Sequence, residues 1–348
     1  MTKRLKRKTG LHFPKNYCKS FSKKIVKIIR PDVLERAIFI IYHPSAKTFF
    51  TNNLAISKLH HTLVYYLTNT VEKMIKINDL NFGYSKNQLL FKNLSMQLSN
   101  GHIYGLLGKN GAGKSTLLKN LAGLVYAQGG SIDVMGHDPA KRQPALLQQI
   151  CFVPEEFYLP SVKIDAYVKA NSAFYPNFDH AYFTNLLAEF DIPVGQKLIN
   201  MSYGQKKKVI IAFGLATQAK LVIMDEPTNG LDIPSKAQFR KIMASALTDE
   251  RCIIISTHQV RDLDNLIDTV IMLDENSVAL KASVEEITNK LVFKKVKEID
   301  DTVIYSEQSL SGYNALMPNF HDEDSKLDLE LLFNAVLSAK NKLKPIFN

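Results

Sequence analysis

The residues from Gly108 to Thr116 have the types and spacing of a phosphate-binding loop. They read Gly-Lys-Asn-Gly-Ala-Gly-Lys-Ser-Thr and match the pattern G-x-x-x-x-G-K-[ST]. Glycines let successive backbone N–H groups turn toward one anion, and the positive end of the following helix faces the same phosphates. We expect Lys114 to reach the β- and γ-phosphates and the Ser115 hydroxyl to hold Mg²⁺. The residues expected to contact the nucleotide here are Gly108, Asn110, Gly111, Ala112, Gly113, Lys114, Ser115 and Thr116.

Two adjacent carboxylates, Asp225 and Glu226, follow an apolar run that begins at Leu221. Such a run is typical of a central parallel strand that is covered on both faces. Ligands of a parallel sheet bind beyond the carboxyl ends of its strands, so both acids should lie beside the phosphate loop. We expect Asp225 to bind Mg²⁺, usually through water, and Glu226 to polarise the attacking water. Taken alone, the segment is equally compatible with a strand that ends in two solvated acids.

The segments that must position these residues alternate between strand and helix patterns. An apolar run ends at residues 104–107, directly before the loop, and a helix-like stretch follows at residues 116–121. This β–α alternation predicts an α/β fold with a mainly parallel, doubly wound core sheet. Further elements are predicted as strands over 149–154, 221–226 and 253–257, a helix over 206–216, and a terminal hairpin of residues 270–273 and 278–280 around residues 274–276.

Residues 201–205 read Met-Ser-Tyr-Gly-Gln and stand directly before a helix-like run, and Asp225 comes twenty positions after Gln205. Together with the phosphate loop and the Asp-Glu strand end, this order resembles the ATP-binding cassette (ABC) ATPases, a family of phosphate-loop NTPases. Their signature is usually Leu-Ser-Gly-Gly-Gln. The resemblance implies that Ser202, Gly204 and Gln205 contact ATP. Tyr203 departs from the usual glycine, at the place that varies most in that family.

Other segments fall in the order of the same family. Residues 227–232 look like the D-loop, which crosses a dimer interface and here supplies Asp232. His258 follows a predicted strand, at the place of the switch histidine. Tyr84 matches the aromatic residue that stacks on adenine. Without the resemblance, the histidine would be interpreted as structural and the tyrosine as a surface or packing residue.

Glu155 stands where the family has its Q-loop glutamine, directly after Pro154. A carboxylate at this place can still bind Mg²⁺ and face the γ-phosphate, so the resemblance implies that hydrolysis is retained. Proline followed by glutamate also resembles the subgroup that serves drug, antibiotic and sodium exporters. This favours export over import.

Composition and segment length limit the classes of protein to which this chain can belong. The chain has 348 residues, 46% of them hydrophobic and 22% charged, as in an ordinary globular protein. The apolar stretch 37–42 is too short for a spanning helix, which needs about twenty residues. Three widely spaced cysteines, Cys18, Cys151 and Cys252, predict neither a disulfide framework nor a metal site. A reducing cytoplasm fits these cysteines, and the resemblance implies that a permease holds the protein at the inner face of the cell membrane.

The positive charge is concentrated in residues 1–73. This leader contains 15 of the 44 basic residues and three of the 33 acidic ones. The rest of the chain therefore has 29 basic and 30 acidic residues, which nearly balance. A basic segment suggests a tether to nucleic acid or anionic lipid. The leader shows no sustained helix or strand period, and residues 74–80 look like the true beginning of an ABC ATPase. We prefer a misassigned start codon to a real basic extension.

Three regions are predicted along the chain: the leader over 1–73, the ABC ATPase domain over 74–282 and a small C-terminal α/β appendage over 283–348. Within the ATPase domain we expect antiparallel edge strands over 75–80 and 89–98, and an inserted helical subdomain over about 159–200 with breaks at Pro176 and Pro193. The appendage is predicted to contain helices over 285–291 and 327–337 and strands over 291–293 and 302–305. Its sequence indicates no chemistry.

The resemblance implies two ATPase subunits, identical or different, that face each other head to tail. ATP and Mg²⁺ on the phosphate loop of one subunit are then closed over by Ser202 and Gly204 of the other, and closure drives a separate transmembrane permease. The alternative is a soluble ABC ATPase that acts on ribosomes or nucleic acid. A single phosphate loop, no heptad run and a suspect basic leader make this alternative the weaker one, so no nucleic acid is expected as a partner.

Overall fold

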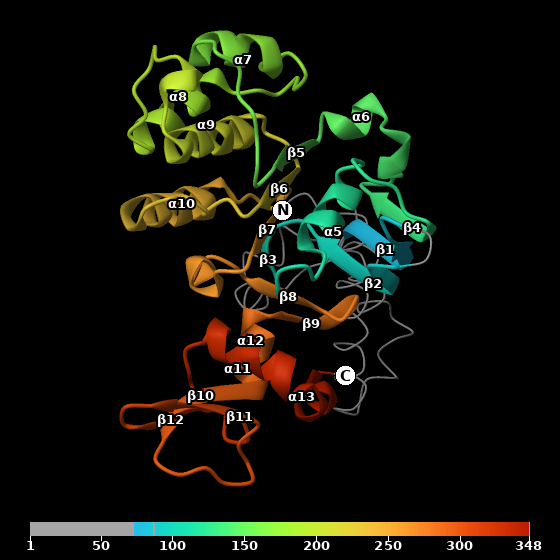
Figure 1. The fold of residues 1–348 in the computed structure, drawn as a ribbon, viewed down its shortest axis with the longest axis vertical. Helices are drawn as coiled ribbons and strands as arrows, with labels where there is room; N and C mark the ends of the chain where they lie inside the picture. Colours follow the sequence, from blue (N-terminus) through green and yellow to red (C-terminus); the bar gives the residue numbers. More distant parts are fainter. Residues whose placement is uncertain (1–72, 86–87, 348) are drawn as a thin grey trace, which may run out of the picture. The chain divides into compact units, whose positions relative to one another are not determined.

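The computed structural model describes residues 73–85 and 88–347. These residues form a six-stranded sheet and two three-stranded sheets, with helices between them (Figure 1). The predicted leader lies outside the described residues except for Lys73, with which strand β1 begins. The hypothesis of a misassigned start codon lies outside them as well. No helix of the described part combines the length and the apolar character that crossing a membrane requires.

The core sheet has the strand order β5-β6-β7-β3-β8-β9. Its first five strands are parallel, and β9 pairs antiparallel with β8. This confirms the predicted α/β fold with a mainly parallel core and a terminal hairpin. The strands are β3 (His102–Gly108), β5 (Ile150–Val153), β6 (Leu221–Asp225), β7 (Cys252–Thr257), β8 (Thr269–Asp274) and β9 (Ser277–Ser283).

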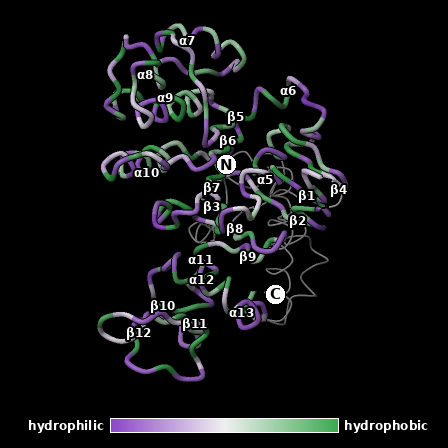
Figure 2. The backbone as a smooth tube through the Cα atoms, viewed as in Figure 1, coloured by the Kyte–Doolittle hydropathy of each residue, from purple (hydrophilic) through white to green (hydrophobic). Residues whose placement is uncertain are grey.

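Side chains of the core strands alternate between two hydrophobic clusters. On β7, Ile253 and Ile255 belong to one cluster, while Cys252 and Ile254 belong to the other. The first cluster is covered by α9 (Tyr203–Ala216) and α10 (Ile233–Ala246), and the second by α5 (Lys114–Leu121). Both faces are therefore buried, which explains the continuous apolar runs of these strands (Figure 2).

A three-stranded antiparallel sheet covers the α5 side with the order β2-β1-β4. Its strands are β1 (Lys73–Phe82), β2 (Phe91–Ser99) and β4 (Gly129–Val134). The prediction that residues 75–80 form an edge strand is wrong, because β4 pairs with the second edge of β1, Ile75 opposite Val134. The short helices η3 (Pro139–Lys141) and α6 (Pro144–Leu147) lead from β4 to β5.

Helices occupy the segment predicted as the inserted subdomain. They are α7 (Ile164–Ser172), α8 (His180–Glu189) and the 3-10 turn η4 (Leu198–Asn200), and α9 follows. The breaks at Pro176 and Pro193 fall between these helices, as predicted. Figure 1 shows α7, α8 and α9 gathered together at one end of the described part. The signature lies in the first residues of α9, which extend from this group toward the core sheet.

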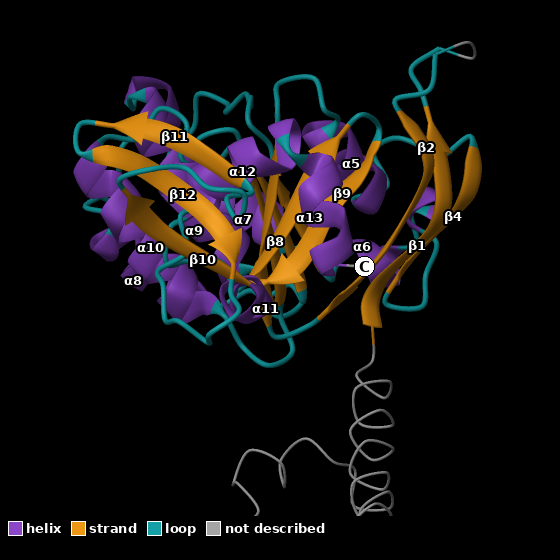
Figure 3. Ribbon diagram, turned by 90° about the horizontal axis from the view of Figure 1, so that it is seen from below, coloured by secondary structure: helices purple, strands orange, loops and turns teal. Residues whose placement is uncertain are grey.

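The C-terminal appendage consists of a second antiparallel sheet and three helices (Figure 3). The strand order of this sheet is β10-β12-β11. Its elements are α11 (Val284–Lys290), β10 (Leu291–Val296), β11 (Tyr305–Ser309), β12 (Gly312–Pro318), α12 (Leu329–Ser338) and α13 (Lys340–Phe347). The predicted strand over 302–305 is wrong except at its last residue. Asp300 accepts a hydrogen bond from the backbone N–H of Thr302 at 2.9 Å, which forms a turn before the strand. Neither β12 nor α13 was predicted.

The appendage contacts the ATPase part through α12, α13 and the ion pairs of Arg261 and Lys340. Arg261, in the 3-10 helix η5 (Val260–Leu263), lies 2.6 Å from Glu330, and Lys340 lies 3.2 Å from Asp274. Asp274 opens the turn between β8 and β9. In the same turn, the Asn276 carbonyl accepts a 3.5 Å hydrogen bond from the backbone of Lys92 in β2. This turn therefore joins the core sheet to the antiparallel sheet and to the appendage.

Candidate nucleotide-binding site

The predicted phosphate loop lies between β3 and α5. Gly111 and Gly113 have positive φ values of 82° and 95°, a backbone region that glycine adopts without strain. A Cβ atom at Gly113 would also lie 2.7 Å from the Phe91 ring, so no larger residue fits. Because α5 begins at Lys114, the N–H groups of its first turn point into the loop. The segment therefore has the geometry that anion binding needs.

The Lys114 side chain is buried, and its ammonium group donates to the carbonyl of Gly108 at 2.9 Å. Its Nζ atom also lies 3.9 Å from Oε1 of Glu226. Burial lowers the pKa of Lys114, and the charges of Glu226, Asp225 and Glu155 oppose that effect. The structure thus brings the predicted lysine and all three predicted acids into one electrostatic environment.

The acids Asp225 and Glu226 end β6, and His258 follows β7, the neighbouring strand. Nδ1 of His258 lies 2.9 Å from Oε1 of Glu226. Glu226 is buried and has a positive φ of 47°, which turns its side chain out of the strand direction. Ser256 of β7 donates to Asp225 at 2.6 Å and accepts from the backbone N–H of Glu226 at 3.1 Å. Ser256 was not predicted, and its place two residues before His258 is the only signal for it.

Glu155 follows β5, on the other side of β6. Its Oε1 atom accepts a hydrogen bond from Asn229 at 3.1 Å. Glu155 is half-buried, whereas its neighbour Glu156 is exposed. The four consecutive strands β5, β6, β7 and β3 therefore present Glu155, the two acids of β6, His258 and the phosphate loop at the same edge of the sheet.

Tyr84 lies beside the phosphate loop. Its hydroxyl is 3.1 Å from the hydroxyl of Thr116 in α5, and its ring stands edge-on to Phe82 with centroids 5.1 Å apart. The side chain is 70% exposed, which leaves a ring face open to solvent. An aromatic face at this distance from the loop is suited to stacking on a base.

Ser202, Gln205 and Asp232 are used as helix caps. Ser202 and Gln205 form a capping box at the start of α9, and Asp232 accepts from the N–H of Ser235 at the start of α10. The Ser235 hydrogen bonds lower the pKa of Asp232. Gly204 lies against Gly230, whose carbonyl would be 3.1 Å from a Cβ atom at position 204. Across residues 73–85 and 88–347, no hydrogen bond joins these signature and D-loop residues to residues 108–116.

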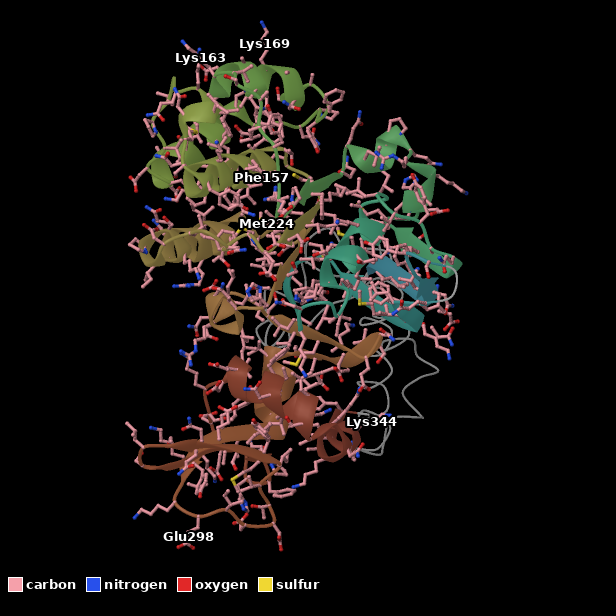
Figure 4. All side chains as sticks on the ribbon, in the orientation of Figure 1. Phe157, Lys163, Lys169, Met224, Glu298 and Lys344 are labelled. Carbon is pink, nitrogen blue, oxygen red and sulfur yellow. The ribbon has the colours of Figure 1, made fainter. Side chains whose placement is uncertain are left out.

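Three residues near the site were not predicted: Phe157, Tyr203 as a contact residue, and Lys207. Phe157, labelled in Figure 4, stacks on Tyr203 with ring centroids 5.3 Å apart and an interplanar angle of 19°. Lys207 is fully buried, unlike its neighbours Lys206 and Lys208. The signal for Lys207 was available in the spacing. It stands four residues before Ile211 and seven before Gly214, on the buried face of α9.

The sequence of this chain is similar to those of known transporter proteins. The family model described as "ABC transporter" matches residues 91–229. The lantibiotic transport ATP-binding protein SrtF of Streptococcus pyogenes is 31% identical over 235 residues, which cover 64% of this chain and 99% of SrtF. This chain belongs to the ABC transporter ATP-binding protein family. It is an ABC ATPase, the ATP-binding and ATP-hydrolysing subunit of a transporter.

Two further relatives agree with the family. The ABC transporter ATP-binding protein YtrB of Bacillus subtilis (strain 168) is 27% identical over 269 residues, 74% of this chain and 91% of YtrB. A solved structure titled "Structure of ATP binding subunit of ABC transporter" has a TM-score of 0.57 and 25% identity, and covers 62% of this chain and 91% of that one. The names of these ABC proteins give no support to the ribosomal or nucleic-acid alternative.

The matched segment divides the predicted site. It contains the phosphate loop, Glu155, the signature and both acids of β6. Tyr84 precedes it, and Asp232 and His258 follow it. These three residues lie outside the family model, and this structure shows their contacts: Tyr84 with Thr116, Asp232 with Ser235 and His258 with Glu226.

Proposed function

We propose that this ABC ATPase powers export through a separate membrane permease, and that it hydrolyses ATP at composite sites between two ATPase subunits. The observation that carries the proposal is the grouping of Lys114, Glu226 and His258 at one edge of the core sheet, where Oε1 of Glu226 is shared by the other two side chains. This grouping supplies a cation for phosphates, a carboxylate for water and a residue that orients the carboxylate.

The proposed roles in hydrolysis follow from these contacts. The phosphate-loop N–H groups and the Lys114 ammonium bind the phosphates, and Tyr84 stacks on adenine. Glu226 accepts a hydrogen bond from the attacking water and orients it toward the γ-phosphate. His258 holds the Glu226 carboxylate in that position through Nδ1. Most of the rate gain then comes from placement and charge, because phosphoryl transfer asks little covalent chemistry of the protein.

Mg²⁺ is the metal that fits the oxygen donors beside the loop. The described residues contain no cluster of three or more His, Cys, Asp or Glu side chains that would hold a metal by themselves. Mg²⁺ commonly binds through one or two carboxylates together with substrate phosphates and water. We propose Ser115, Asp225 and Glu155 as its contacts. When bound, the ion would neutralise charge on the β- and γ-phosphates.

A second ATPase subunit is proposed because, among the described residues, no hydrogen bond joins the signature to the phosphate loop of its own chain. Ser202 is exposed, and its hydrogen bonds stay within the first turn of α9. The start of α9 combines an exposed hydroxyl with the free N–H groups of a helix N-terminus, which suits a phosphate from another molecule. We propose that Ser202, Gly204 and Gln205 close over ATP held by the second subunit, with Asp232 at the interface.

Export is supported by Glu155 after Pro154, and by the name of SrtF, a lantibiotic transport protein. The permease is proposed to be a separate chain that holds this ATPase at the inner face of the cell membrane.

Glu226→Gln in the full chain tests the composite site. The neutral side chain should keep ATP bound and stop turnover, so that an ATP-dependent dimer accumulates on size-exclusion chromatography. Adding Lys114→Ala to the same variant should remove the dimer, because ATP no longer binds. A monomer at saturating ATP would refute the composite site. Co-purification of a multi-spanning membrane protein supports the transport role, whereas co-purification of ribosomes would refute it.

A further inference from the structure

The first two turns of α9 contact the segment that follows β5. Tyr203 donates its hydroxyl hydrogen to the carbonyl of Glu155 at 2.7 Å, and its ring stacks on Phe157. Lys207, one turn later on the same face, donates to the same carbonyl at 2.8 Å. One carbonyl thus receives two donors from the helix that carries the signature. We name Glu155, Phe157, Tyr203 and Lys207 the signature clamp.

Lys207 extends the clamp to the catalytic strand end. Its ammonium group also donates to the carbonyl of Pro154 at 3.3 Å and to that of Glu226 at 3.4 Å. It lies 5.3 Å from the Phe157 ring centroid and 5.7 Å from that of Tyr203. A buried ammonium group is costly unless it is fully paired, and three carbonyls and two aromatic faces provide that pairing here.

The two segments held by Lys207 carry the acids that the proposed function places beside the γ-phosphate. The Glu155 side chain bonds to Asn229, and the Glu226 side chain bonds to His258. Their carboxylates lie in the electrostatic environment of Lys114, while their carbonyls meet at Lys207. A shift of either segment therefore changes the position of the α9 N-terminus.

Tyr203 adds contacts that the family's usual signature residue cannot make. The family's usual glycine at this place has neither a ring nor a hydroxyl, so it could form neither the stack nor the bond to Glu155. The Tyr203 ring also lies 2.7 Å from where a Cβ atom of Gly230 would be, so it contacts the D-loop segment too. The side chain is 45% exposed, and its contacts hold it in place beside the signature.

We propose that Tyr203 and Lys207 are positioning residues that hold the signature helix to Glu155 and Glu226. Nucleotide on the phosphate loop of one subunit then fixes the position of that subunit's signature, which closes over the nucleotide of the other composite site. This rests on the proposed dimer. ATP on the phosphate loop fixes Glu155 and Glu226, the clamp fixes the start of α9, and the second ATP meets a signature that is already in place. The two sites then bind and hydrolyse ATP cooperatively.

The test compares single variants of the full chain in ATPase assays over a range of ATP concentrations. Tyr203→Phe keeps the stack and removes one hydroxyl, and it should lower kcat roughly five-fold, the loss expected of one neutral hydrogen bond. Lys207→Met should lower kcat by roughly ten-fold or more, because it removes a charged donor from three carbonyls. In both variants, the Hill coefficient should fall from above 1 to 1, while binding of ATP to the phosphate loop stays within about two-fold of wild type.

Matched controls separate this role from general stability. Lys208→Met removes the neighbouring lysine, which donates to Phe190 and Gln238 instead, and Tyr182→Phe removes a hydroxyl from α8. Both should keep the wild-type Hill coefficient. The double variant Tyr203→Phe, Lys207→Met should be no worse than Lys207→Met alone, because both residues act through the Glu155 carbonyl.

The proposal would be overturned if the two clamp variants kept the wild-type Hill coefficient. It would also be overturned if the Hill coefficient of Lys208→Met fell as far as theirs. A wild-type coefficient of 1 would do the same. None of these results would contradict the proposed function, which is tested separately by the ATP-dependent dimer of Glu226→Gln and by co-purification. If Lys207→Met does not fold, Tyr203→Phe decides the question alone.

Discussion

Nδ1 of His258 lies 2.9 Å from Oε1 of Glu226, and the same Oε1 atom lies 3.9 Å from the ammonium group of Lys114. One carboxylate oxygen therefore connects the residue after β7 to the phosphate loop after β3. The strand between the two acids and the loop is β7, so this contact spans the centre of the core sheet. Hydrolysis should depend on how this oxygen is held.

His258→Ala should lower kcat by about 10²-fold, the lower end of what a general base contributes, because Glu226 loses the group that orients it. Affinity for ATP should change little, because the imidazole contacts Glu226 and not the phosphate loop. Steady-state ATPase assays together with equilibrium ATP binding measure the two quantities separately. His102→Ala is the matched control, since His102 also pairs with a carboxylate, Asp268 at 2.9 Å, but at the opposite end of β3. Equal losses in both variants would remove His258 from the site.

Lys114→Ala should reduce ATP affinity by about 10²-fold or more, because charge-assisted bonds to phosphates are among the strongest in proteins. Equilibrium binding of ATP measures this loss. Lys119→Ala changes a lysine in the last turn of the same helix and should bind ATP as the wild type does. Unchanged affinity in Lys114→Ala would show that residues 108–116 do not bind the phosphates.

Glu155→Gln should weaken the dependence of the ATPase rate on free Mg²⁺. The carboxylate carries a full charge close to the γ-phosphate, and two like charges at 4 Å oppose each other by about 4 kcal/mol at an effective dielectric of 20 unless a metal lies between them. The glutamine oxygen can still accept the bond from Asn229. Rates titrated against free Mg²⁺ compare the two enzymes, with the exposed neighbour variant Glu156→Gln as the control. Superimposable curves would mean that Glu155 does not contact the metal.

Lys207 should make stability depend on pH. Burial lowers its pKa from 10.5 to about 8, against the opposing charges of Glu155, Asp225 and Glu226. Because the folded-state pKa is the lower one, the unfolded chain binds more protons between these values, and stability rises as pH increases from about 8 to 10.5. Relative to Lys207→Met, the wild type should gain up to about 3 kcal/mol across this window. Urea unfolding at several pH values measures the gain. Lys208→Met should instead follow the wild type.

Much of the site could be predicted from sequence because its residues stand at the ends of buried strands. The apolar runs before Gly108, Asp225 and His258 identify the strands, and parallel pairing brings their ends to one edge whatever the loops do. Family resemblance added Tyr84 and Glu155, whose neighbours in space come from other elements. Neither residue stands out by type or spacing alone.

The sequence was less informative where pairing is antiparallel and distant. The place of Ile75 in a middle strand depends on Val134, and nothing local to either residue indicates the partner. In the appendage, Tyr305 begins a strand of mostly polar residues, which has no apolar alternation to detect. Lys207 was hidden for a different reason. It is the middle lysine of three, and only the helical period separates the buried one from its half-buried neighbours.

The turn between β8 and β9 also bears on where a probe can be attached. Hairpin turns are usually the first choice for a fluorophore or an inserted tag. Here Asp274 pairs with Lys340 and the Asn276 carbonyl accepts a hydrogen bond from Lys92. An insertion would therefore disturb the core sheet, the β2-β1-β4 sheet and the appendage together. The turn between β11 and β12 offers a safer position, because Leu310 at its tip is fully exposed and belongs to the appendage, which carries none of the predicted site residues. A label at Leu310 could be used to study the ATPase without disturbing the contacts of the turn between β8 and β9.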